Sequence, residues 1–192
     1  MRKITLYMQS SVDGIVSDPD RWANISDEIL EDALQMYENI GTVVFGGRSY
    51  PSMAQYWTGA EQTSASELER AFAKKINEID KIVISRSPVK TAWKNSRCIQ
   101  VADEDALFAA VQKLRSSKGG PISVEAGVKL WQLFLQNRLY DELWMLVHPA
   151  IAGSGQRLFD VEDGARLQFL ASRSYENGVM GLRYALDRTG FI

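Results

Sequence analysis

A Gly-Gly-Arg-Ser segment, Gly46–Ser49, follows directly on the β-prone run Thr42–Phe45. Pro51 comes just after it, where proline commonly occupies the first turn of a helix. Glycines let the backbone approach a ligand closely, the first N–H groups of a helix have no partner within it, and Arg48 adds a positive charge. The segment therefore predicts a phosphate-binding junction between a strand and a helix. A tight turn without a ligand gives the same pattern.

Two other junctions have the same character. The run Lys81–Ile84 ends at Ser85 and Arg86, and the short run Ile122–Val124 leads through Gly127 into a helical pattern. In open sheets with helical crossovers, ligands gather where the strands end and the helices begin. Three such junctions at one edge of a sheet favour a ligand site over three unrelated turns.

The rest of the chain supplies a sheet around these junctions. Periodic apolar residues predict a helix from Asp27, a short helix that carries Met53 and Trp57, and a longer helix to about Asn77 with Ser64 as its cap. Two more helices are expected after Asp103 and after Gly127. Strands are expected at Lys3–Met8, Thr42–Phe45, Lys81–Ser85, Cys98–Val101, Ile122–Val124, Glu142–Pro149, Gln168–Tyr175 and Val179–Asp187.

The order of these elements predicts an α/β fold. Strands and helices alternate first, which implies a mostly parallel sheet flanked by helices. The last third is rich in strands, and Asn177-Gly178 is a strong signal for a hairpin between Gln168–Tyr175 and Val179–Asp187. We therefore expect a mixed, mostly parallel sheet with a C-terminal antiparallel hairpin. A single domain over residues 1–192 accommodates it, since no Pro/Gly/Ser-rich linker divides the chain.

Composition narrows the classes of function. The 22 basic and 24 acidic residues nearly balance and form no long block, so a nucleic-acid surface is not indicated. Cys98 and His148 are the only residues of their kinds, which argues against disulfides and against a His/Cys metal cluster. The apolar stretch after Lys3 is too short and polar for a signal sequence, and no long apolar run follows. The sequence predicts a cytoplasmic protein without a metal and without a membrane segment.

Several motifs in order along nearly the whole chain resemble one family. They are Ser11-x-Asp13-Gly14, Gly46-x-Arg48-Ser49-Tyr50, Lys81–Ser85, Gly127, Leu139–Leu143, His148-Pro149, Gly153-x-Gly155 and Leu158-Phe159. The set resembles the dihydrofolate-reductase fold, and within it the reductase domain of riboflavin biosynthesis and its stand-alone relatives. The resemblance implies an eight-stranded mixed sheet, NADPH as cofactor, and hydride transfer to a pterin or aminopyrimidine. The reaction would be that of a 5-amino-6-(5-phosphoribosylamino)uracil reductase or of a dihydrofolate reductase.

By this resemblance, the cofactor diphosphate would lie at two helix N-termini, and Ser85 and Arg86 would lie near the adenosine ribose. Arg48 or Arg86 would favour the 2′-phosphate of NADPH through charged hydrogen bonds. The cofactor-binding residues implied are Gly46, Gly47, Arg48, Ser49, Ser85, Arg86, Ala126, Gly127 and Val128.

The resemblance also implies three residues at the reacting end. Asp13 would lie beside the nicotinamide and the substrate, although an Asx turn that shapes its loop explains the residue equally well. Trp22 and Asp27 have the spacing of the tryptophan and acidic residue that bind the pterin in folate reductases. An acidic residue in a first helical turn is also expected simply because it complements the helix dipole.

Two features favour a second class of function. Where folate reductases have Gly-Gly this chain has Ala126-Gly127, and Glu125 places a carboxylate beside the expected diphosphate. These departures favour a catalytically weak ligand-binding or dimer-forming protein. We expect a homodimer, because the C-terminal strands bear apolar residues that no later helix can cover. The residues expected to remain partly exposed there are Tyr175, Met180, Leu182, Tyr184 and Phe191.

Overall fold

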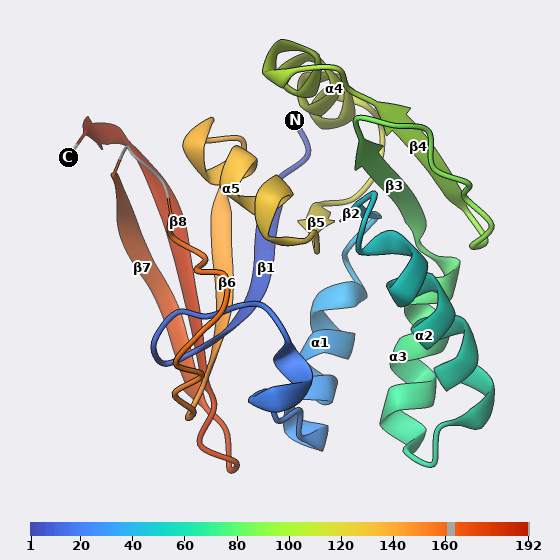
Figure 1. The fold of residues 1–192 in the computed structure, drawn as a ribbon, viewed down its shortest axis with the longest axis vertical. Helices are drawn as coiled ribbons and strands as arrows, with labels where there is room; N and C mark the ends of the chain where they lie inside the picture. Colours follow the sequence, from blue (N-terminus) through green and yellow to red (C-terminus); the bar gives the residue numbers. More distant parts are fainter. Residues whose placement is uncertain (161–163, 192) are drawn as a thin grey trace. The chain divides into compact units, whose positions relative to one another are not determined.

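Eight strands form a mixed sheet in the computed structural model, which describes residues 1–160 and 164–191 (Figure 1). The strand order is β4-β3-β2-β5-β1-β6-β8-β7. The predicted fold class is confirmed, including helices beside the sheet and an antiparallel C-terminal hairpin. The strands are β1 (Ile4–Ser11), β2 (Thr42–Gly46), β3 (Asp80–Ser85), β4 (Ser96–Gln100), β5 (Ile122–Val124), β6 (Glu142–His148), β7 (Ala165–Ser174) and β8 (Met180–Phe191). The helices are α1 (Asp27–Tyr37), α2 (Tyr50–Thr63), α3 (Glu67–Glu78), α4 (Glu104–Ser116) and α5 (Val128–Gln136), with a 3-10 turn at Pro19–Arg21.

The chain divides into two compact units that interleave in sequence. Unit 1 consists of residues 1–2 and 26–127, and unit 2 consists of residues 3–25 and 128–192. Unit 1 therefore contains β2 to β5 with α1 to α4, and unit 2 contains β1, α5 and β6 to β8.

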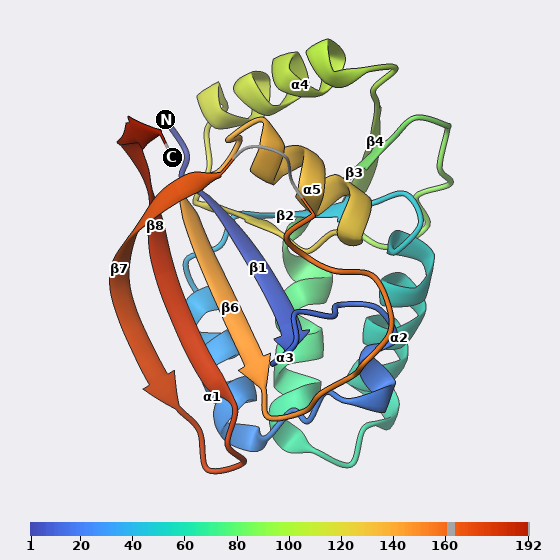
Figure 2. The same ribbon diagram turned by 60° about the vertical axis from the view of Figure 1, so that its left-hand side comes forward.

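Unit 1 is built on a parallel arrangement in which β3 and β5 both pair with β2. Helices α1, α2 and α3 lie side by side, as Figures 1 and 2 both show. Their apolar faces join Val43, Phe45 and Val83 in a buried cluster that also contains Trp93. Burial of this apolar area is the main stabilising contribution in the unit.

A buried lysine closes the end of α3 in unit 1. The amine of Lys81 donates to the carbonyl oxygens of Ile76, Asn77 and Ile79 at 2.8, 2.9 and 2.7 Å, and it lies 4.6 Å from the centre of the Trp93 ring. The last carbonyls of a helix lack intrahelical donors, so this charged group satisfies and neutralises the helix end. Burial lowers the pKa of Lys81 to about 8, which leaves the amine protonated at neutral pH.

Unit 2 contributes four strands to the sheet, and among them β6 lies between β1 and β8. Strand β1 is parallel to β6, whereas β8 is antiparallel to it and forms the hairpin with β7. The hairpin turns at Gly178, whose φ of 81° suits glycine and confirms the Asn-Gly signal. His148 ends β6, where it lies opposite Ser11 of β1.

The length of α2 and the N-cap of α3 differ from prediction, whereas the N-cap of α4 agrees with it. Helix α2 is longer than expected, and α3 begins with Ser66 as its cap, because the Ser66 hydroxyl accepts the Glu69 N–H at 3.2 Å. Ser64 was the predicted cap, but its hydroxyl instead donates to the Glu69 carboxylate. Asp103 caps α4 as predicted, accepting from Ala106 at 2.8 Å.

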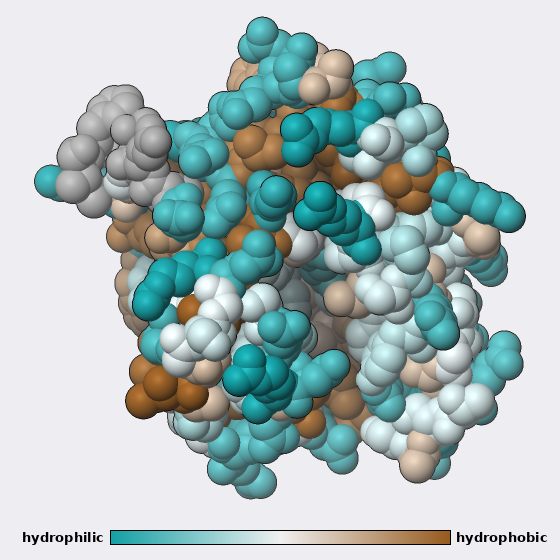
Figure 3. Space-filling view, in the orientation of Figure 1, coloured by the Kyte–Doolittle hydropathy of each residue, from teal (hydrophilic) through white to brown (hydrophobic). Residues whose placement is uncertain are grey.

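Hydrophilic residues cover most of the face that Figure 3 shows, with hydrophobic ones in small groups. Among the helices within residues 1–160 and 164–191, none is long and apolar enough to span a bilayer. The same residues contain no group of three or more histidine, cysteine or acidic side chains placed to hold a metal ion.

Candidate functional site

The carboxyl ends of β2, β3 and β5 meet at one edge of the sheet in unit 1. Gly46 at the end of β2 pairs with Ile84, and Val44 pairs with Val124 at the end of β5. The backbone continues this pairing past the strands, since Gly47 donates to Ile84 and Glu125 donates to Val44. The prediction that the three junctions share an edge is confirmed.

The glycines at this edge differ in the space around them. A Cβ on Gly47 would lie 2.6 Å from the Ser85 hydroxyl and 2.8 Å from the Ser85 Cβ, so this glycine is required for β2 and β3 to approach. A Cβ on Gly46 would make ordinary contacts at 3.6 Å or more with Ser49, Gly127 and Ala126. A Cβ on Gly127 would meet nothing within 4 Å. The open side of the junction is therefore at Gly127, directly before α5.

Helix α2 begins at this edge with a first turn suited to an anion. Ser49 precedes the helix, and its hydroxyl donates to the carbonyl of Gly46 at 3.2 Å, so it makes no bond to the helix N–H groups. Tyr50 is buried, and its hydroxyl accepts the N–H of Trp93 at 2.9 Å, which ties the helix start to the core. The free N–H groups and the dipole at the N-terminus of α2 favour a negatively charged ligand.

Two exposed arginines follow the neighbouring strands. Arg48 comes after β2 and Arg86 after β3, and within the described chain neither guanidinium has a hydrogen-bond or ion-pair partner. The backbone of Arg86 is held by the side chain of Gln100, which donates to its carbonyl at 3.0 Å. Both positive charges remain available to a ligand phosphate.

Glu125 directly follows β5 at this edge. Burial raises the pKa of its carboxyl group to about 8, and the Ser123 hydroxyl donates to Oε1 at 3.0 Å. The group is therefore mostly protonated at pH 7, and a neutral carboxyl does not repel a diphosphate as a carboxylate would. From the sequence, Glu125 was expected to be a carboxylate that repels the diphosphate. The rise in its pKa depends on the burial of the side chain, which the sequence does not show.

We expect the stability of the protein to fall as pH rises from about 4.5 to about 8. An unfolded chain ionises Glu125 near its ordinary pKa of 4.5, whereas the folded chain retains the proton to about 8, so folding is favoured below this range. Urea unfolding at pH 5 and pH 8.5 measures the difference, expected to be a few kcal/mol at most. Glu125→Gln should make the free energy of unfolding less dependent on pH. If the variant and the unaltered protein showed the same pH dependence, the attribution to Glu125 would be contradicted.

In unit 2, Asp13 joins two loops. Its carboxylate accepts the Ser11 hydroxyl at 2.6 Å and the N–H groups of Ala152 and Gly153 at 2.9 and 2.8 Å. These bonds hold the pKa of Asp13 at about 2, the largest contribution coming from Ser11. Asp13 therefore remains ionised at neutral pH and fastens the loop after β6 to the loop after β1, which run side by side in Figure 2.

Trp22 and Asp27 belong to different units. The indole of Trp22 is buried in unit 2, where its N–H donates to the Ser17 carbonyl at 2.9 Å and its ring lies edge-on to His148 with centroids 5.5 Å apart. Asp27 is exposed and opens α1 in unit 1, where its charge complements the helix dipole. Their predicted roles with Asp13 at the reacting end stay predictions.

Sequence reasoning missed a polar pair in unit 2. The ring of His148 is fully buried and contacts Gln9, whose Oε1 lies 3.0 Å from Nε2. Gln9 is near the end of β1, on the same face as Tyr7 because side chains alternate along a strand. That alternation was the one signal in the sequence that could have found Gln9.

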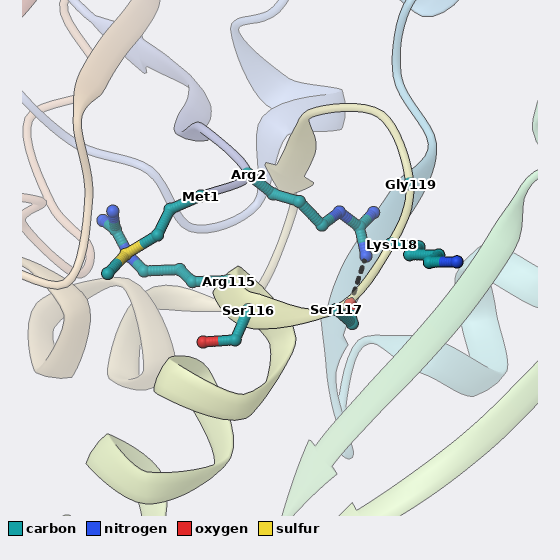
Figure 4. Close-up of a pocket in the computed structure, with 7 residues that line it drawn as sticks. All are labelled: Met1, Arg2, Arg115, Ser116, Ser117, Lys118 and Gly119. Atoms are coloured by element: carbon teal, nitrogen blue, oxygen red, sulfur yellow. Dashed lines mark hydrogen bonds between the residues drawn. The ribbon is translucent and has the colours of Figure 1, made fainter.

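A separate hollow of about 590 Å³ opens in unit 1, lined by Met1, Arg2 and residues 115–119 (Figure 4). The guanidinium of Arg2 donates to Ser117, Thr42 and the Gly120 carbonyl, so each of its three nitrogens has an acceptor within the protein. None of the predicted site residues lines this hollow. Arg2 therefore ties the start of the chain to β2 and to the segment after α4.

Comparison with known proteins identifies relatives along the whole chain. Residues 2–180 match the model of the RibD C-terminal domain. The chain is 25% identical over 188 residues to the uncharacterized protein YyaP of Bacillus subtilis, covering 95% of this chain and 94% of that protein. A putative riboflavin biosynthesis protein from Shewanella sp. PV-4 superposes with a TM-score of 0.66 at 15% identity, covering 97% and 99% of the two chains. Dihydrofolate reductase from Enterococcus faecalis, solved with NADP(H), superposes with a TM-score of 0.59 at 10% identity and covers 96% of each chain.

Proposed function

Since the chain belongs to the RibD C-terminal domain family, we propose that it is a cytoplasmic NADPH-dependent reductase of the riboflavin or pterin type. The observation that carries the proposal is the edge of unit 1 where β2, β3 and β5 end. There, an open glycine precedes one helix, a second helix begins with free N–H groups, and two arginines lack partners among the described residues. This combination suits a dinucleotide diphosphate and an additional phosphate.

The residues present fit the cofactor. Gly46, Gly127 and the first turn of α2 would hold the diphosphate through backbone N–H groups, and Ser85 with Arg86 would contact the adenosine ribose. Ala126 and Val128 flank Gly127 in the sequence. When bound, NADPH would supply a hydride to the substrate. Glu125, being protonated, removes the charge that favoured the alternative of a binding protein without activity.

We propose that the substrate is a small aminopyrimidine or pterin, such as 5-amino-6-(5-phosphoribosylamino)uracil or a dihydropterin. In this proposal Asp13 has a positioning role and fixes the loop at Ala152 and Gly153. Its carboxylate already accepts three hydrogen bonds from the protein. A carboxyl group with a pKa of about 2 does not donate protons at neutral pH.

NADPH should bind more tightly than NADH. Each hydrogen bond from Arg48 or Arg86 to the charged 2′-phosphate contributes about 1.5–3 kcal/mol, which corresponds to at least a tenfold difference in Kd. Titration with each nucleotide, followed by the fluorescence of the five tryptophans, measures both constants. Arg86→Gln should reduce the difference between the Kd values for NADH and NADPH. Lys74→Gln removes an exposed charge on α3 and should leave that difference unchanged. Equal affinities for the two nucleotides in the unaltered protein would refute this cofactor assignment.

We also propose a homodimer formed through β7. This strand ends the sheet order, pairs only with β8, and exposes Leu167, Phe169 and Leu170 by 37, 58 and 42%. A long edge strand with exposed apolar side chains is a template for pairing with a second copy. Tyr175, predicted to be exposed in this region, is buried, and the side chain of Phe191 lies outside the described residues.

Sedimentation at micromolar concentration tests the dimer. We expect one species at twice the chain mass of 21.6 kDa, and dissociation in Phe169→Lys, which puts a charge on the edge strand. A species of 21.6 kDa for the unaltered protein would rule the dimer out.

A further inference from the structure

The peptide groups on both sides of Arg86 are held by hydrogen bonds within unit 1. On the side of β3, the Ser85 carbonyl accepts the N–H of Val101 at 2.9 Å. On the other side, the Arg86 carbonyl accepts from Nε2 of Gln100 at 3.0 Å. The next N–H, that of Ser87, donates to the Ser85 hydroxyl at 3.2 Å. Because both flanking peptide groups are held, the φ and ψ angles of Arg86 are restricted, and so is the direction of its Cα–Cβ bond.

Gln100 makes its contact from the edge strand β4. This strand is first in the strand order and pairs with β3, and Gln100 lies opposite Ser85. The side chain of Gln100 is exposed, so it contributes little to the core of unit 1. A carbonyl oxygen can only accept, so the amide nitrogen of Gln100 must face Arg86. Gln100 therefore holds the backbone of Arg86 and leaves the guanidinium to a ligand.

The rest of the segment between β3 and β4 is anchored to the core of unit 1. Trp93 is buried, and its backbone N–H donates to the Tyr50 hydroxyl at 2.9 Å. Tyr50 is the first residue of α2, so this bond joins the segment to the helix whose N-terminus is proposed to hold the diphosphate. Val89 packs beside Gly47, because a Cβ on that glycine would lie 3.2 Å from Cγ2 of the valine. The segment is thus preformed, and a preformed site loses less conformational entropy when a ligand binds.

We propose that Gln100 is a positioning residue of the nucleotide site, which directs Arg86 toward the 2′-phosphate by holding its backbone. An arginine side chain has several rotatable bonds, so fixing the direction of the first one limits the region that the guanidinium samples. Loss of the Gln100 contact should weaken the bonds to the 2′-phosphate and leave those to the rest of the nucleotide unchanged. This inference rests on the proposed function and extends the site to β4, a strand that holds none of the predicted site residues.

Two nucleotides that differ only in the 2′-phosphate test the proposal. Adenosine 2′,5′-bisphosphate and 5′-AMP represent the adenosine ends of NADPH and NADH without the nicotinamide. In calorimetry with the full chain at pH 7, the unaltered protein should bind the bisphosphate about tenfold more tightly, as expected for a hydrogen bond to a charged phosphate. Gln100→Met keeps the length of the side chain and removes its donor. It should lower the ratio of the two Kd values about threefold and leave the Kd for 5′-AMP nearly unchanged.

Gln62→Met is the matched control, because it removes an exposed amide near the end of α2. It should leave the ratio of the two Kd values unchanged. A double substitution then separates positioning from a general structural effect. Arg86→Gln removes the guanidinium, so adding Gln100→Met to it should change the ratio no further if Gln100 acts through Arg86.

The proposal is overturned if Gln100→Met keeps the ratio of the unaltered protein, if it weakens both nucleotides equally, or if it lowers the ratio further in the absence of Arg86. It is also overturned if the unaltered protein binds neither nucleotide or does not distinguish them. Titration with NADPH is a separate readout of the proposed function. A ratio that depends on Gln100 without any binding of NADPH rejects only the reductase, and NADPH binding with an unchanged ratio in Gln100→Met rejects only the role of Gln100.

Discussion

Gly127→Val is expected to raise the Kd for NADPH at least a hundredfold while the protein stays folded. The new side chain meets no atom of the described chain within 4 Å at Cβ, so it occupies the open space before α5 at little cost in stability. In the proposed complex that space belongs to the diphosphate, and a branched side chain would hold the cofactor away from the N–H groups of the helix. Nucleotide titration and thermal unfolding together measure the two effects.

Gly59→Val is the matched control, because Gly59 in α2 also has open space at Cβ and lies in a helix interior away from the proposed cradle. It should bind NADPH normally. Gly47→Val is not a suitable test, since a Cβ there would lie 2.6 Å from the Ser85 hydroxyl oxygen and 2.8 Å from the Ser85 Cβ, so the substitution would disturb the contact between β2 and β3 as well. Normal NADPH binding by a folded Gly127→Val protein would mean that the junction is only structural.

Lys81→Met should destabilise the protein by about 3 kcal/mol or more. Three carbonyl oxygens at the end of α3 would lose their shared donor in a buried setting, and each unsatisfied group costs about 1–3 kcal/mol. For a chain of this length the melting temperature should fall by roughly 6–12 °C.

Lys74→Met provides the comparison, because Lys74 is an exposed lysine on the same helix. Its stability should stay within about 0.5 kcal/mol of the unaltered protein. Similar losses for the two substitutions would show that the contacts of Lys81 carry no special weight.

Regular patterns in the sequence were sufficient to predict the framework. The periodic apolar residues of α1 and the β-prone runs of β2 and β5 gave these elements nearly their observed bounds, since local propensity and burial agree there. The segments after β2, β3 and β5 could be predicted to lie next to one another, because the carboxyl ends of parallel strands meet at the same edge of a sheet. The Asn-Gly turn placed the C-terminal hairpin for a similar reason, because its geometry is local.

The side chains that were not predicted depend on long-range contacts. Gln9 and His148 are separated by 139 positions, and the tautomer of the ring is set by Asn24, which no periodicity connects with either. Glu125 resembles any acidic residue until its burial is known. Lys81 was predicted only as the start of a strand, because its three acceptors become neighbours when α3 ends beside it.

The interleaving of the two units implies an order of events during synthesis. Residues 26–127 of unit 1 leave the ribosome as one stretch, whereas β1 of unit 2 must wait for its partner β6, with Thr5 opposite Glu142. At roughly 5–20 residues per second, that wait lasts on the order of ten seconds. Unit 1 can therefore form while the chain is still growing, and the edge of β1 that pairs with β6 stays unpaired until the last third emerges. During that interval this edge presents unpaired backbone N–H and C=O groups, to which a strand of another chain could pair.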